Sequence, residues 1–228
     1  NVGIGSGAGD AITTGDANTF IGYDAGGAVN TGASNTAVGY GCMQNNTTGA
    51  RNTSMGMAAA QSNTSSNYNV ALGDQALYRN TNGGENVMVG FLAGNQNGIN
   101  TTSIHYNTGV GSRALYSNAS SPNNTAVGAY ALQTLVDGEN NTALGIAAGY
   151  RIDKGDDSTF IGYSAGYNVT TATGIVCLGY KAGEGQTTTT SNLLYIARDN
   201  TAHSNAATWI HGSTSGDCYQ GDNSSTWS

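Results

Sequence analysis

The sequence predicts an all-β fold, a parallel β-solenoid (β-roll) of about twelve coils built on a seventeen-residue repeat. A phrase typified by NTAVGAYAL at residues 124–132 recurs along the chain. Successive copies keep this spacing ten times and exceed it once, by four residues, between Asn86 and Asn107. So strict a period indicates stacked repeats. Residues of each copy alternate as in a short strand, which is followed by glycine. The copies begin at Asn1, Asn18, Asn35, Asn52, Asn69, Asn86, Asn107, Asn124, Asn141, Ser158, Ile175 and Asn192.

The composition limits the classes of partner. The 228 residues include 35 glycines and one proline, and only 9% are charged. The net charge is −7, and no basic stripe exists to bind a phosphate backbone, so a nucleic-acid partner is not expected. No run approaches the roughly 18 apolar residues of a membrane span, so membrane insertion is not expected either. Cys42 and Cys177 stand where other repeats have small or apolar residues, and they are predicted to be buried fillers.

Positions two to four, counted from the first residue of each repeat, are predicted to form a strand. Position two is β-branched and position four is apolar in the first eleven repeats, as in Thr36 and Val38 or Thr125 and Val127. Alternate residues of a strand share a face, so these two positions are expected to pack together inside the coil. Position three is also largely apolar and points the other way, so both faces are expected to be covered. The simplest second cover is another copy of the chain.

Glycine at position five, as in Gly22, Gly39 and Gly128, predicts a sharp bend after the strand. Such uniform glycine indicates a positive φ or the close approach of another backbone segment. Position eight is alanine in the first eleven repeats except at Cys42, which predicts a tight second strand facing the first across a thin interior. Tyrosines recur at positions six and ten and are expected to cover that interior.

Asparagine begins ten of the twelve repeats, as at Asn35 and Asn124. Stacked asparagine side chains hydrogen-bond along a column, so an asparagine ladder is predicted. Positions eleven to seventeen are variable and polar, with frequent glycine at position fifteen, which is typical of turns. One coil is therefore expected to contain two short strands and a return loop, and the coils are expected to stack at roughly 4.8 Å.

The phrases NTFIGY at residues 18–23 and NTAVGY at residues 35–40 resemble the repeats of phage tail-fibre proteins. They are also similar to the head repeats of trimeric autotransporter adhesins. The resemblance covers residues 1–191. It implies a homotrimer of left-handed parallel β-rolls around a shared axis.

Residues 192–228 look like the segment that precedes the self-cleaving intramolecular chaperone of phage tail fibres and endosialidases. In that family the chaperone assists trimer assembly and then cuts itself off after a serine. The resemblance therefore implies a repeat shaft in residues 1–191, a C-terminal cap or tip in residues 192–228, and a processed end at Ser228.

The function implied by the resemblance is structural and receptor-binding. The chain is expected to form part of a viral tail fibre on the virion, a trimeric rod that attaches to polysaccharide or another glycan on the host cell surface. The alternative is the head of a trimeric adhesin on a bacterial cell surface. No enzymatic activity and no cofactor are expected for either.

Four aromatic residues near the C-terminus are candidate ligand contacts: Trp209, His211, Tyr219 and Trp227. Aromatic side chains combine a large apolar surface with a polar group, so those at the end of a fibre are suited to stack on sugar rings. The alternative is that they seal the end of the solenoid, where the last coil would otherwise expose unpaired backbone. The two roles are compatible.

The segment 95–106 carries the four-residue insertion that breaks the period. Insertions in solenoids map to loops on one face, which is often a binding face. His105 and Tyr106 are therefore further candidates for contact with a sugar. The alternative is a tolerated bulge without a ligand.

Glu139 and Asp156 fall at position sixteen of successive coils, and Asp153 is close to them in sequence. Carboxylates stacked about 5 Å apart suit a Ca²⁺ ion, which is bound by clustered oxygens. These three residues are the cation candidate. The spacing also resembles that of a retaining glycosidase pair. Interleaved Arg151 and Lys154 favour a third interpretation, a solvated acidic turn.

Overall fold

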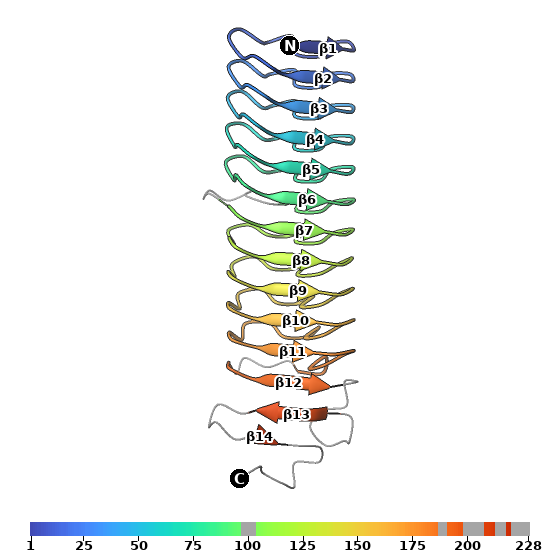
Figure 1. Ribbon diagram of the computed structural model, residues 1–228, viewed down its shortest axis with the longest axis vertical. Helices are drawn as coiled ribbons and strands as arrows, with labels where there is room; N and C mark the ends of the chain where they lie inside the picture. Colours follow the sequence, from blue (N-terminus) through green and yellow to red (C-terminus); the bar gives the residue numbers. More distant parts are fainter. Residues whose placement is uncertain (97–103, 187–190, 198–207, 213–217, 220–228) are drawn as a thin grey trace.

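The computed structural model describes residues 1–96, 104–186 and 191–197, together with the backbone of two strands at 208–212 and 218–219. The described part is a single stack of coils whose strands follow one another in chain order in one sheet (Figure 1). The strands are β1 (Val2–Ile4), β2 (Thr19–Ile21), β3 (Thr36–Val38), β4 (Thr53–Met55), β5 (Val70–Leu72), β6 (Val87–Val89), β7 (Thr108–Val110), β8 (Thr125–Val127), β9 (Thr142–Leu144), β10 (Thr159–Ile161), β11 (Val176–Leu178), β12 (Leu194–Ala197), β13 (Thr208–Gly212) and β14 (Cys218–Tyr219).

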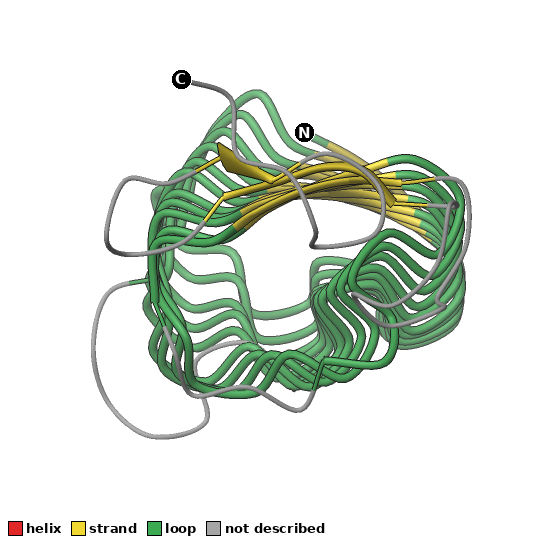
Figure 2. Cartoon of the chain, turned by 90° about the horizontal axis from the view of Figure 1, so that it is seen from below, coloured by secondary structure: helices red, strands yellow, loops and turns green. Residues whose placement is uncertain are grey.

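The predicted parallel β-solenoid is confirmed. From β1 to β12 each strand pairs in parallel with the next, and equivalent positions of successive repeats are register partners, as for Thr36 and Thr53. Viewed along the stack, the strands form one wall of the coil and loops form the rest of its outline (Figure 2). The coils are therefore stacked copies of one unit.

The described coils contain one strand each, so the predicted second strand is wrong. Positions seven and nine both adopt positive φ, as in Ala58 (52°) and Ala60 (48°), and two left-handed residues so close together prevent an extended strand. The backbone there is still bonded to the next coil, because Ala60 N donates to Ala76 O at 2.9 Å. The inner wall, by which we mean the part of the coil at positions seven to nine, is therefore a stack of hydrogen-bonded turns.

The predicted orientation of the strand faces is also wrong. Position three fills the interior of the coil, as Phe20 and Ala37 show with no exposed surface, whereas positions two and four face outward. The buried asparagine at position one explains this arrangement. Because side chains alternate along a strand, the residue two places after a buried asparagine is buried as well. Position four gives the outward face apolar side chains, and the cover expected on that face stays a prediction.

The predicted asparagine ladder is confirmed. Asn35 Oδ1 accepts a hydrogen bond from Asn52 N at 3.0 Å, and Asn35 Nδ2 donates to Gly49 O at 2.8 Å. Asn124 makes the same two contacts, with Gly138 O at the end of its own coil and with Asn141 N at the start of the next. At position one of a later coil, Ser158 Oγ accepts from Ile175 N at 3.1 Å. Each of these side chains thus links two coils through buried backbone groups, which are costly to leave unpaired.

The glycine bend at position five is confirmed for both predicted reasons. Gly22 and Gly128 have φ of 132° and 133°, in the region that favours glycine. A Cβ at Gly22 would lie 2.5 Å from the carbonyl oxygen of Gly39 in the next coil. Position eight is small because it is enclosed, and its alanines are buried from Ala25 onward.

Position twelve belongs to the core rather than to the polar return loop in which it was predicted. In the middle coils it is a buried asparagine, as at Asn46, whose Nδ2 donates to Gly49 O at 3.0 Å and whose Oδ1 accepts from Gly49 N at 2.9 Å. In later coils it is a buried apolar residue, such as Leu135 or Ile152. Either an internally bonded amide or an apolar side chain therefore fills this site.

The two irregularities of the period leave the strand ladder intact. Across the insertion, Val87 is the register partner of Thr108. At the end of the repeats, Val176 is the partner of Leu194, so this last spacing is one residue longer than the regular period and the predicted start at Asn192 is one residue early. The shift places Tyr195 at position three, where it is buried. Beyond it, β13 pairs antiparallel with β12, and β14 pairs antiparallel with β13.

Candidate functional site

The candidate tip residues lie partly outside the described chain. Trp209 and His211 belong to β13 and Tyr219 belongs to β14, where the backbone is described. His211 is the register partner of both Tyr195 and Tyr219, so the topology brings His211 and Tyr219 onto neighbouring strands. Trp227 and Ser228 lie outside the described residues.

In the inserted segment, residues 97–103 lie outside the description. His105 is engaged with the preceding coil, because Gly84 N donates to His105 Nδ1 at 3.1 Å. Tyr106 is 59% exposed, and its ring centroid lies 5.8 Å from that of His105. The structure therefore leaves Tyr106 accessible on the side of the rod, while His105 stabilises the turn.

The three acidic candidates do not form a common cation site. Glu139 and Asp156 line a hollow of about 240 Å³ together with Asp137, whereas Asp153 does not line it. Glu139 N donates to Asp156 Oδ1 at 2.9 Å, so this carboxylate already has a backbone partner. Within the described ranges, no three His, Cys, Asp or Glu side chains are grouped in a way that could hold a metal ion.

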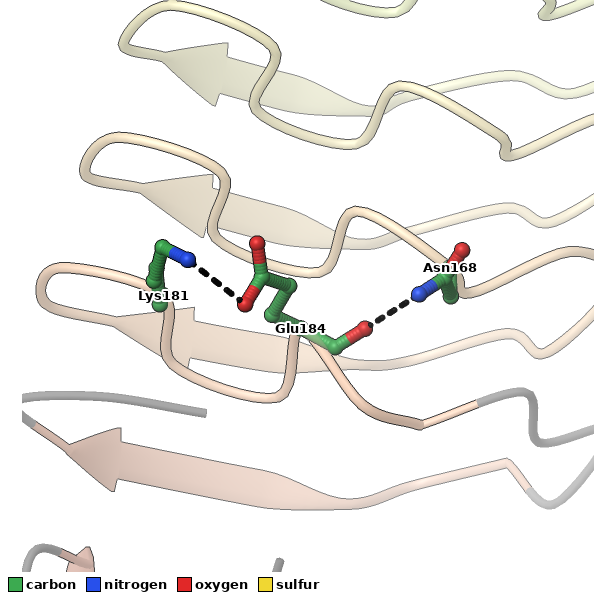
Figure 3. Close-up of polar contacts among 3 residues, drawn as sticks. All are labelled: Asn168, Lys181 and Glu184. Atoms are coloured by element: carbon green, nitrogen blue, oxygen red, sulfur yellow. Dashed lines mark hydrogen bonds and ion pairs between the residues drawn. The ribbon is translucent and has the colours of Figure 1, made fainter. Parts of the chain in front are cut away.

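A polar cluster joins the coils that follow β10 and β11 (Figure 3). Lys181 Nζ lies 3.2 Å from Glu184 Oε2, and Asn168 Nδ2 donates to Glu184 O at 2.8 Å. The hydrogen bond to the Glu184 carboxylate raises the pKa of Lys181. The ion pair connects two positions of one turn, and the amide connects that turn to the previous coil, so the cluster is a structural link.

The outer face of the sheet carries the side chains of positions two and four, which were predicted to lie inside the coil. We call the side chains at positions two, four and six of the coils from β1 to β11 the outer stripe. None of the residues at positions two and four is buried in the single chain. Ile4 is 58% exposed and Tyr40 is 60% exposed. The outer stripe includes large apolar side chains with at least a third of their surface exposed: Val2, Ile4, Ile21, Tyr23, Tyr40, Met55, Met57, Val87, Phe91, Val110, Leu144, Ile146, Ile161, Tyr163 and Tyr180.

Tyrosines at position six form two stacked pairs on the outer stripe. The ring centroids of Tyr23 and Tyr40 are 5.2 Å apart, and those of Tyr163 and Tyr180 are 5.4 Å apart. Tyrosine at this position was expected to cover the interior, and that prediction is wrong because position six lies on the outside of the coil. The sequence could have shown this, because side chains alternate along a strand and an inward asparagine at position one turns positions two and four outward.

The predicted burial of Cys42 and Cys177 is confirmed, and both are free thiols. Burial raises the pKa of each thiol to about 12. Because the thiolate is the reactive form, neither residue is a nucleophile in the folded chain near neutral pH.

Searches of family models, of curated proteins and of solved structures each returned no match for this chain. In the part of the chain that the structure describes, no helix has the length and apolarity needed to cross a membrane.

Proposed function

We propose that this chain is a structural and receptor-binding part of a phage tail fibre, a homotrimeric rod on the virion that attaches to a glycan on the host cell surface. The proposal rests on the resemblance of the repeats together with the geometry of the stack. Residues of the shaft set the length and stiffness of the rod, and residues at the tip and in the inserted segment contact the glycan.

The observation that carries the proposal is the unbroken ladder from β1 to β12. Every strand pairs in register with the next, and the asparagine side chains connect the coils a second time inside the stack. Each coil adds about 4.8 Å of length, and bending the stack would break buried hydrogen bonds. Such a rod holds a terminal binding site at a fixed distance from its base.

Attachment would gain strength from three identical copies. When one copy binds a repetitive surface glycan, the others are held at a high effective concentration, so weak individual contacts add up to strong binding. Trp209 and Trp227 at the tip and Tyr106 on the side of the rod would supply the aromatic contacts.

The test combines solution mass with glycan binding. Light scattering should give three times the 23.1 kDa mass of the chain. On a glycan array, Trp209→Ala and Trp227→Ala should each weaken binding at least tenfold. Tyr68→Ala, which removes an exposed aromatic ring far from the tip, is the matched control and should bind like the parent. A monomeric mass, or tip variants that bind unchanged, would contradict the proposal.

A further inference from the structure

We propose that the outer stripe is the contact surface between parallel, in-register copies of this chain. This inference rests on the oligomeric part of the proposed function and is independent of any glycan. It names the face through which the copies meet and the residues at the centre of the contact.

The first argument is the apolar extent of the outer stripe. Its three positions in eleven coils contain thirty-three side chains, and Asp74 is the only charged one. Soluble monomers rarely expose contiguous apolar patches beyond a few hundred Å². A stable interface uses roughly 20–30 residues on each side, so the outer stripe is large enough to hold copies together.

The second argument is the distribution of charge around the coil. Residues 1–191 contain eleven acidic and six basic side chains, and all of them except Asp74 lie off the outer stripe. Contact through another face would place acidic side chains of a chain with net charge −7 near one another or bury them. Contact through the outer stripe leaves the other charges in water.

The third argument identifies a second copy as the occupant. The outer stripe runs along all the coils from β1 to β11, so a partner that covers it must be equally long and must repeat at the same spacing between strands. Another copy of the chain meets both conditions. In a trimer around an axis along the rod, cyclic symmetry makes the copies parallel and brings equal positions to equal heights.

Position four is expected to lie at the centre of the contact, because positions two and six flank it on the same outward side. Leu144 and Ile21 both occupy this position and are exposed in the single chain. They lie in β9 and β2, which are seven strands apart along the stack. A contact that runs along the whole rod must therefore include both.

Disulfide trapping tests the contact directly. Leu144→Cys and Ile21→Cys are made separately in a Cys218→Ser background and oxidised with copper phenanthroline. For each variant, more than half of the protein on a non-reducing gel should consist of chains joined to another copy by a disulfide bond between the introduced cysteines. Thr48→Cys, at an exposed position off the outer stripe, should be linked in less than a tenth. An antiparallel arrangement gives self-linking at no more than one height, so linking at both heights requires parallel, in-register copies.

A charge variant supplies a second readout. Leu144→Glu should lower the solution mass about threefold while the circular dichroism of the chain is kept, because this side chain faces outward. Thr48→Glu should leave the mass unchanged. Absence of self-linking at both sites, or an unchanged mass for Leu144→Glu, would overturn the inference. If the chains are linked but no glycan binds, the proposed attachment role is contradicted and the contact surface is supported. If a glycan binds but the chains are not linked, the contact surface is contradicted and the attachment role is supported.

Discussion

Positions five and nine of the coil both hold glycine at positive φ, but of these two only position five is glycine in every coil from β1 to β11. At position five, φ lies between 118° and 140°, and a Cβ at Gly5 would lie 2.5 Å from the carbonyl oxygen of Gly22. At position nine, φ lies between 48° and 68° whether the residue is Gly, Ala, Met or Leu. A neighbouring backbone therefore dictates glycine at position five, whereas side chains decide the residue at position nine.

The side chains that decide position nine lie at position three of the same coil and in the neighbouring coils, since a Cβ at Gly149 would meet Leu132 and Phe160. Phe20 is paired with Gly26, and a Cβ at Gly26 would lie 2.7 Å from the Phe20 ring. In the coil of Ala71, the small side chain at position three is accompanied by the large Leu77 at position nine, and both are buried. Close packing of the interior makes the two volumes complementary. Repeats that differ in sequence at these positions thus fill the interior of the coil with a similar total volume of side chains.

The largest effect is expected at position five. Gly128→Ala would place a Cβ against the backbone of Gly145 at a φ of 133°, so we expect a loss of more than about 4 kcal/mol of unfolding free energy or failure to fold. Urea unfolding followed by circular dichroism measures the loss. Gly27→Ala is the control, since its Cβ would meet only ordinary contacts, and it should change stability by less than about 0.5 kcal/mol. Equal effects at the two sites would show that the neighbouring backbone does not dictate glycine at position five.

The next effect tests the exchange of volume between positions three and nine. Phe160→Ala empties a fully buried site and should cost about 3–5 kcal/mol. Gly166→Leu alone should also destabilise, because its Cβ overlaps the Phe160 ring. The double variant should recover at least half of the summed loss, since leucine adopts the same backbone at Leu132. A double-mutant cycle with no coupling energy would contradict the complementarity.

A smaller effect is expected from Cys42 at alkaline pH. Its pKa rises from 9.0 to about 12 in the folded chain because the thiol is buried. The folded state therefore keeps a proton that the unfolded state loses above pH 9, and the stability from this group falls as pH rises from 9 towards 12. The slope is about 1.4 kcal/mol per pH unit at most. Unfolding of Cys42→Ala, which restores the usual residue of position eight, should show a shallower alkaline decline than the parent.

The smallest effect is expected at Ser54, a position-three residue beside Ala60. Ser54 Oγ is buried and has no hydrogen-bond partner in the structure as described. Because a buried unpaired hydroxyl is unfavourable, Ser54→Ala should raise the unfolding free energy by about 1 kcal/mol. Ser158→Ala is the contrast, since Ser158 Oγ accepts from Ile175 N, and it should lower stability. A loss of stability in Ser54→Ala would show that its hydroxyl is satisfied.

The functional candidates were predicted less well than the scaffold. Tyr106 is exposed as a ligand contact requires, but His105 is used in a hydrogen bond with the backbone of Gly84 in the preceding coil. The acidic residues Glu139 and Asp156 are neighbours, whereas Asp153 does not join them in the hollow. A stacking period places residues at equal heights, but it does not specify how turn side chains point within one coil.

The sequence by itself determined the features that every coil must repeat. A fixed period with Gly128 and its equivalents, and an asparagine such as Asn124 at most of the starts, is enough to specify parallel coils, a tight bend and a buried amide ladder. These features follow from backbone constraints, which do not depend on what the other side chains are.

Tertiary structure decided which face of the strand is inside, where the inner wall turns, and how Tyr195 fills the last parallel coil. β-Branched residues at position two and largely apolar residues at positions three and four are compatible with either face inside, because both faces carry apolar side chains. The choice comes from the asparagine side chains, which must reach a carbonyl group at the end of their own coil and the first N–H group of the next coil, and from the volumes that meet across the interior. Packing between coils therefore settled what periodicity alone left open.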